Sequence, residues 1–191
     1  FSVKVFIEVL VMFLYISIRT TIFCILLGYP TASVFVKDFG KGQGKLILAI
    51  TLPTWINMLV RTYAWRGILQ KDGLINAILG LVGIGPLQML ETNFAVILGM
   101  VYNFLPFMVL QIYSSLSKMD ESYIQAASDL GANKVQTFLK VTLPLSIPGI
   151  ISGVTLVFLP AVSSFFIPKL LGGGKFVLIG NVIENQFLTA G

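Results

Sequence analysis

The stretch TNFAVILGMVYNFLPFMVLQIYSSLS, residues 92–117, decides the fold, because it is long and carries no charge. A helix that crosses a bilayer needs about 20 consecutive, mostly apolar residues. We therefore predict a membrane-spanning helix over this stretch and read the rest of the chain outward from it.

Two further stretches have the length and composition of a crossing. Residues 5–29 are apolar apart from Glu8 and Arg19, and residues 145–168 carry no charge. Both are long enough to span the hydrocarbon layer as helices.

A fourth crossing is predicted over residues 46–68. It reaches spanning length only if Arg61 and Arg66 lie at the membrane interface, beside Tyr63 and Trp65. Aromatic rings are enriched at that depth, so their position supports this reading.

The remaining segments connect these spans. Residues 73–90 are uncharged after Gly73 but rich in glycine, which favours a loop with one short helix. The tail after Pro168 reads as a loop followed by a short amphipathic segment. We expect one transmembrane domain over residues 1–191, with a hydrophilic loop at residues 118–140.

The composition excludes several classes of protein. Of the 191 residues, 56% are hydrophobic and only 11% are charged, whereas soluble domains carry about 25% charged residues. Histidine is absent, which removes the commonest general base and transition-metal ligand, so neither an enzyme nor a metal site is indicated. The net charge of +5 gives no case for nucleic acid binding. The distribution of basic residues over the loops is too even to fix the orientation in the membrane.

The loop at residues 118–140 contains signals for two short helices. Asp120 is placed to cap the first helix, and Gly131 supplies the left-handed residue that ends it. Asn133 and Gln136 have the spacing of a capping box for the second helix. These caps alone fit a connecting loop on the membrane surface equally well.

The residues between the caps are more specific. The run Gln125-Ala126-Ala127-Ser128-Asp129-Leu130-Gly131-Ala132, followed by Leu143-Pro144, resembles the EAA loop of permease subunits in ATP-binding-cassette (ABC) importers. The resemblance implies that this loop is cytoplasmic and docks in a groove of an ATPase subunit. The implied coupling residues are Gln125, Ala126, Ala127, Asp129, Leu130, Gly131 and Ala132. The family's leading glutamate is Gln125 here, and a glutamine keeps hydrogen bonding but cannot form a salt bridge.

Other motifs extend the resemblance over most of the chain, to the spermidine/putrescine branch of these permeases. They are Gly28-Tyr29-Pro30, Leu52-Pro53-Thr54-Trp55, Leu59-Val60-Arg61, Leu105-Pro106-Phe107, Pro148-Gly149-Ile150, Leu170-Leu171-Gly172-Gly173 and Ile179-Gly180-Asn181. The implied fold is all-α: a polytopic integral membrane protein of the MetI-like, type I ABC importer kind. We expect four spans of a six-helix subunit here, with the terminal helices missing.

The resemblance also implies the partners and the place of action. They are ABC ATPase subunits, a second permease subunit, an external solute-binding protein and membrane lipid, in a bacterial cell membrane. No cofactor is implied. Residues 39–45 have two glycine–lysine pairs but lack the first glycine and the Ser or Thr of a Walker A motif, so ATP binding is assigned to another chain.

Polar and aromatic residues inside the predicted spans are candidates for the translocation path. They are Arg19, Trp55, Asn57, Tyr63, Tyr102 and Asn103. Arg19 stands out, because an arginine about 3 Å from mid-depth costs roughly 2.5–3.5 kcal/mol and should face protein or water. A buried contact between helices and a place in the path are both open for it.

Two rival functions remain at this stage. The same machinery could carry another solute, such as an anion or a metal chelate, for which Arg19 would be well placed. A helical channel or scaffold without an ATPase is the more distant alternative.

Overall fold

The computed structural model of the protein describes residues 3–38, 43–164 and 166–173, and every regular element within them is helical. The predicted all-α fold is therefore confirmed. In chain order the elements are α1 (Val3–Asp38), α2 (Gln43–Thr51), η1 (Leu52–Trp55), α3 (Met58–Leu69), α4 (Leu74–Leu81), α5 (Asn93–Ser117), α6 (Ser122–Asp129), α7 (Lys134–Thr137), η2 (Phe138–Thr142), α8 (Leu143–Ser163) and α9 (Phe166–Leu171).

The chain forms two compact units. The first unit combines residues up to Ile22, Pro53–Asn103 and residues from Phe158 onward; the second combines Phe23–Leu52 and Phe104–Val157. The long helices α1, α5 and α8 each contribute one part to each unit.

Three helical segments of the described chain are long and apolar enough to cross a membrane. They are Leu10–Val36, Asn93–Ser117 and Lys134–Ser163. They overlap the spans predicted over residues 5–29, 92–117 and 145–168. The first is longer than predicted, because Pro30 lies inside α1 without ending it.

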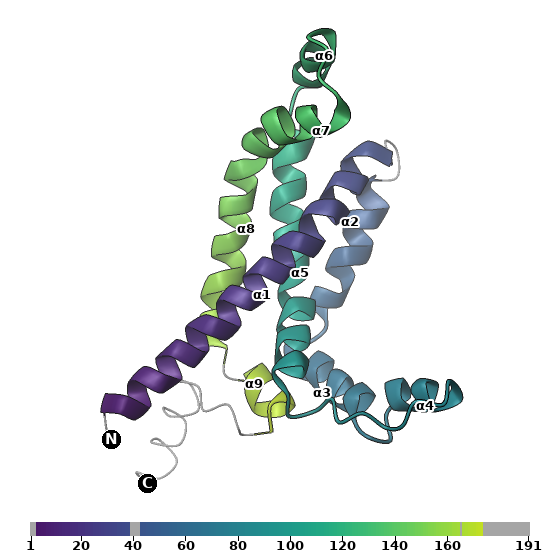
Figure 1. Ribbon diagram of the computed structural model, residues 1–191, viewed down its shortest axis with the longest axis vertical. Helices are drawn as coiled ribbons and strands as arrows, with labels where there is room; N and C mark the ends of the chain where they lie inside the picture. Colours follow the sequence, from purple (N-terminus) through teal and green to yellow (C-terminus); the bar gives the residue numbers. More distant parts are fainter. Residues whose placement is uncertain (1–2, 39–42, 165, 174–191) are drawn as a thin grey trace. The chain divides into compact units, whose positions relative to one another are not determined.

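The last of these helices ends earlier than the sequence suggests. α8 stops at Ser163, and the residues expected to continue it to Pro168 form the separate helix α9. Within the first unit, α9 packs against α3 (Figure 1). It also packs on α5 where Gly99 leaves no room for a side chain: a Cβ there would clash with Leu171 and lie 3.2 Å from Ile167.

The segment predicted as a crossing over residues 46–68 is not one continuous helix. It consists of α2, the 3-10 turn η1 and α3. Pro53 lies in η1, where it cannot donate a backbone hydrogen bond, and Asn57 then takes an extended conformation with ψ 133°. The Asn57 side chain accepts a 2.8 Å hydrogen bond from the Leu59 amide and starts α3. That this segment crosses the membrane stays a prediction.

The glycine-rich connection between α3 and α5 contains the short helix that was predicted for it, α4. Asn76 of α4 is buried and holds the following loop: its amide nitrogen donates to the carbonyls of Gln70 and Leu87, and its oxygen accepts from the Leu87 amide. The connection is thus an ordered part of the first unit.

Close helix contacts form the core of the second unit. Gly149 and Gly153 of α8 face α5, where a Cβ would clash with Ser115 at the first position and would lie 2.5 Å from the Met108 sulfur at the second. A Cβ added to Gly28 of α1 would lie 3.0 Å from the Met108 side chain, so α1 also packs closely on α5 here. Two small residues four positions apart, as here, are typical of close contacts between membrane helices.

Candidate functional site

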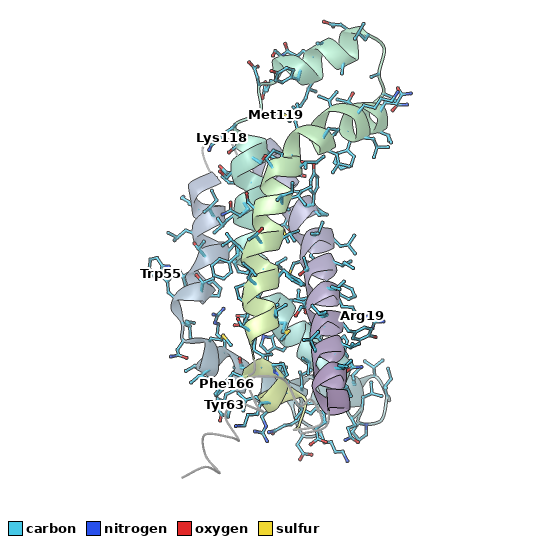
Figure 2. The ribbon with its side chains drawn as sticks, turned by 90° about the vertical axis from the view of Figure 1, so that its left-hand side faces the viewer. Arg19, Trp55, Tyr63, Lys118, Met119 and Phe166 are labelled. Atoms are coloured by element: carbon cyan, nitrogen blue, oxygen red, sulfur yellow. The ribbon has the colours of Figure 1, made fainter. Side chains whose placement is uncertain are left out.

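The loop at residues 118–140, which we call the coupling loop, begins with a capped helix. The Asp120 carboxylate accepts a 2.9 Å hydrogen bond from the Ser122 amide at the start of α6, so it caps the helix as predicted. Bonds from the Ser122 amide, and then from its hydroxyl, hold the pKa of this exposed carboxyl below its ordinary value. The loop starts just beyond α5, at Lys118 and Met119 (Figure 2).

The end of α6 is fixed by Gly131. Its φ of +80° lies in the left-handed region, which side chains other than glycine adopt at a cost. The Ala132 amide reaches back to the Ala127 carbonyl at 3.0 Å, which is the six-to-one bond of a Schellman motif. The predicted left-handed stop is confirmed, and it turns the chain sharply.

The second helix starts with the predicted capping box. The Asn133 side chain accepts from the Gln136 amide at 2.8 Å, and the Gln136 side chain accepts from the Asn133 amide at 3.0 Å. α7 then passes without interruption into the π-helical turn η2 and into α8. Both α6 and α7 pack on η2, and they lie beyond the ends of α5 and α8 that belong to the second unit (Figure 1).

The coupling residues lie on an open surface. Gln125, Ala126, Asp129, Leu130 and Gly131 are exposed, and Ala127 and Ala132 are half-buried. Leu130 is 88% exposed. The same loop has further exposed apolar side chains: Tyr123 on α6, Val135 on α7 and Leu139 on η2. The loop thus presents several apolar side chains on short, capped helices.

The candidate path residues of the first unit occupy different places. Trp55 is 79% exposed and extends outward from η1, and Tyr63 is also exposed on α3 (Figure 2). Asn57 is exposed and caps α3, which accounts for its side-chain oxygen. Tyr102 of α5 packs its ring against Trp65 of α3 in an edge-to-face contact, with centroids 5.4 Å apart.

A cavity of about 260 Å³ lies beside this aromatic pair. Its lining comes from α3 and from the residue before Asn57, with Tyr102 on the α5 side: Ile56, Val60, Arg61, Ala64, Trp65, Ile68 and Tyr102. The Nε and Nη1 atoms of Arg61 are buried there without a hydrogen-bond partner. Tyr102 is the one predicted path residue in this lining.

Asn103 and Arg19 lie elsewhere in the first unit. Asn103 is only 2% exposed; its amide nitrogen donates to the Gly99 carbonyl, and its oxygen has no partner. Arg19 is exposed, with its guanidinium carbon 4.2 Å from the centre of the Tyr15 ring, and its side chain extends outward from α1 (Figure 2). Among the described residues, no hydrogen bond joins Arg19 to Asn57 or Asn103.

Sequence reasoning did not single out the cavity. Arg61 and Trp65 were placed at the membrane interface, but neither was chosen as a site residue. The signal was the four-residue spacing of Arg61 and Trp65, which puts both on one face of α3. In the described part of the chain, acids, cysteines and histidines form no group able to hold a metal ion. The described residues instead offer two places for binding, an exposed surface on the coupling loop and a cavity beside the Trp65–Tyr102 pair.

Comparison with known proteins shows which family this chain belongs to. The family described as "binding-protein-dependent transport system inner membrane component" matches residues 5–191. The chain belongs to this family. Its members are components of transport systems in the inner membrane, so the apolar helices are those of a membrane transport protein.

Two curated members of this transport family are similar to the chain along most of its length. The spermidine/putrescine transport system permease protein PotB of Haemophilus influenzae is 45% identical over 172 residues, which cover 89% of this chain and 60% of the relative. PotB of Escherichia coli is 43% identical over 184 residues, which cover 95% of this chain and 67% of the relative. The chain thus spans roughly three fifths to two thirds of the length of these relatives.

This chain also shares its fold with a transporter of known structure. The crystal structure of a bacterial ABC transporter involved in the import of the acidic polysaccharide alginate matches with a TM-score of 0.73. The match covers 93% of this chain and 67% of that chain at 17% identity. The likeness confirms the predicted ABC importer permease fold.

Proposed function

We propose that this chain is the permease subunit of an ABC importer for spermidine and putrescine, placed in the bacterial cell membrane with several crossings. The observation that carries the proposal is the 43–45% identity to PotB proteins over 89–95% of this chain. ATP is hydrolysed on a partner subunit, a second permease subunit completes the path, and an external binding protein delivers the solute.

The coupling loop supports the transport half of the proposal. Capped helices on both sides of Gly131 give the ATPase a surface of fixed shape, with Leu130 at its most exposed point. The helix from Lys134 to Ser163 then joins this surface to a membrane-crossing segment without a flexible link. Movement of the ATPase can therefore be passed to the membrane helices as a displacement of α7 and α8.

The aromatic residues support the polyamine half. Trp65 and Tyr102 line a cavity, and Trp55 and Tyr63 are exposed nearby in the sequence. Aromatic faces attract ammonium groups by about 0.5–2 kcal/mol each, so a polycation is bound without a carboxylate at every nitrogen. Acids that complete its recognition come from the partner subunit.

One observation favours a second candidate, the same machinery for an anionic solute. Arg61 is among the residues that line the cavity, two of its guanidinium nitrogens are buried without a hydrogen-bond partner, and none of the lining residues is acidic. A carboxylate or phosphate group would pair with Arg61, whereas an ammonium group would be repelled by it.

The test is uptake by the reconstituted complex. The permease is purified with its ATPase, second permease and binding protein, placed in liposomes, and supplied with labelled spermidine or putrescine and internal ATP. We expect ATP-dependent uptake that stops when the ATPase is inactivated by a Walker-B substitution. Uptake of organic anions but not of polyamines would replace our proposal with the second candidate.

A further inference from the structure

Within the second unit, Tyr29 of α1 contacts the first residue of the π-helical turn η2 and the first turn of α8, which follows η2. Its ring meets the Phe138 ring edge to face, with centroids 5.6 Å apart and planes at 87°. Its hydroxyl lies 3.0 Å from the Ser146 hydroxyl, in a buried pair separated by 117 positions in the sequence. Phe138 opens η2, and Ser146 lies in the first turn of α8.

The direction of the hydrogen bond follows from the Ser146 contacts. The Ser146 hydroxyl donates its one proton to the Leu143 carbonyl at 2.8 Å. It is then free only to accept, so the Tyr29 hydroxyl is the donor. Tyr29 is 8% exposed and Ser146 is 1% exposed, so removal of the Ser146 hydroxyl would leave the buried Tyr29 hydroxyl without this partner.

The contacts close into a circuit. The Leu143 amide donates to the Phe138 carbonyl, which is the bond that defines the π-turn, and the Leu143 carbonyl accepts from Ser146. The path runs from Phe138 through Tyr29, Ser146 and Leu143 and back to Phe138. Tyr29 therefore braces the wider turn from outside the helix that contains it.

Both helices are deformable where they meet. A π-turn within an α-helix is rare and is frequently found at functional sites. On α1, Tyr29 stands between Gly28, which lacks a side chain, and Pro30, which has no amide hydrogen for the Leu26 carbonyl. Proline and glycine are the usual places where a helix bends.

We propose that Tyr29 is a positioning residue for energy coupling. It ties the Gly28–Pro30 segment of α1 to the π-turn at the base of the coupling loop, so that the two helices move together when the ATPase pulls on α6 and α7. This inference rests on the proposed ABC importer function, since it assigns a route for motion that begins at the coupling loop.

The route has a physical basis in the packing of the loop. α6 and α7 both contact η2, so displacement of either helix loads the π-turn directly. Without the brace, η2 can relax or bend alone, and the displacement is absorbed there. The solute path then responds less to each ATP hydrolysed.

The test uses Tyr29→Phe, which removes the hydroxyl and keeps the ring, and Ser146→Ala, which removes its acceptor. Ser152→Ala is the matched control, because the Ser152 hydroxyl donates only to the Pro148 carbonyl within α8 and is exposed. Uptake and ATP hydrolysis are measured on the same reconstituted full complex.

We expect both variants to move about two- to twelvefold less solute per ATP, the range set by one buried hydrogen bond. ATPase binding and the hydrolysis rate should stay near those of the wild type. The double variant should be no worse than Ser146→Ala, because that change already removes the bond from Tyr29 together with the bond to the Leu143 carbonyl. Ser152→Ala should leave the ratio unchanged.

An unchanged ratio of solute to ATP in both variants, with a transporting wild type, would overturn the inference and leave the proposed function intact. A purely structural role would lower the yield of folded complex without changing the ratio, and would equally overturn it.

A second measurement does not depend on the solute. Amide hydrogen exchange at Leu143, whose N–H closes the π-turn, should be at least twofold faster in Tyr29→Phe than in the wild type and the control. Equal exchange in all three proteins would refute the role of Tyr29 as a brace, whether or not the wild type transports any solute. Failure of the wild type to transport any of the solutes tried would instead refute the proposed function.

Discussion

Replacement of Gly131 by alanine tests whether the shape of the coupling loop matters for ATPase docking. Gly131 has a φ of +80°, and a Cβ built on it meets no other atom within 4 Å. The cost of alanine is therefore that of the left-handed backbone alone, about 1–2 kcal/mol. No steric effect complicates the result.

That cost translates into docking affinity. If the ATPase binds only the native turn, 1–2 kcal/mol reduces the population of this turn, and the apparent affinity, by about 5- to 30-fold. Asparagine adopts positive φ more readily, so Gly131→Asn should lose less than Gly131→Ala. Proline should lose most, because its φ is fixed near −65° and it lacks the amide that donates to the Ser128 carbonyl at 2.9 Å.

The assay is binding of the purified ATPase to the permease complex in detergent, followed by uptake in liposomes. Gly80→Ala is the control, since Gly80 lies in α4, has open space around its Cβ position and does not have a positive φ. It should be neutral or slightly stabilising. Equal ATPase affinity for glycine, asparagine, alanine and proline at position 131 would refute the argument that this turn shapes the docking surface.

Three further predictions concern single positions. Gln125→Glu should be nearly silent in ATPase binding and Gln125→Leu harmful, because the exposed amide needs only to hydrogen bond; equal affinity in all three proteins would remove Gln125 from the interface. The Asp120 cap, with its lowered pKa, should stabilise α6 fully above the ordinary aspartate pKa of about 4 and lose this effect as the pH falls through the lower folded value. Exchange of the α6 amides, corrected for the intrinsic pH dependence, should show this change in the wild type and not in Asp120→Ala. Arg19→Gln should lower the yield of assembled complex and leave polyamine uptake per folded complex similar, because Arg19 is exposed in this chain and needs a contact from another subunit; a large loss of normalised uptake would favour an anionic solute.

Local signals in the sequence were sufficient for the coupling loop. Asp120, Gly131 and the Asn133–Gln136 box each act within a few residues, so their geometry depends little on the rest of the molecule. The same holds for Gly149 and Gly153, whose spacing puts both on one face of α8.

Proline positions show where local reasoning ended. Pro30 and Pro106 lie inside long helices, whereas Pro53 lies in the 3-10 turn that separates α2 from α3. Each of these prolines lacks the amide hydrogen that would bond within the helix. The long helices continue through Pro30 and Pro106 because their packing outweighs one lost bond, whereas a short helix at Pro53 has less packing to offset that loss. This balance depends on tertiary contacts, which no window of sequence contains.

Side-chain pairs between helices were also beyond the sequence. α1 carries large apolar side chains on both its buried and its exposed faces: Ile16 is buried and Leu26 is exposed. The periodicity of apolar residues therefore does not fix which face meets a neighbouring helix. The pairs Trp65–Tyr102 and Tyr29–Ser146 depend on that rotation. Gly28-Tyr29-Pro30 could be noticed as a motif, but the partner of Tyr29 could not be named.

Two arginines of the first unit, Arg19 and Arg61, constrain how a polycation could pass. Arg61 lines the cavity with Trp65 and Tyr102, and Arg19 is exposed about 6 Å along α1 from the centre of the Leu10–Val36 segment. A polyamine that met either guanidinium unaccompanied would be repelled, so the carboxylates that neutralise them must come from outside the cavity lining described here. An acid that pairs with Arg61 would satisfy its buried nitrogens and leave the aromatic faces open to the ammonium groups. For the proposed polyamine importer we therefore expect the second permease subunit to contribute acids opposite α3, so that recognition of the solute is divided between the rings of one chain and the carboxylates of the other.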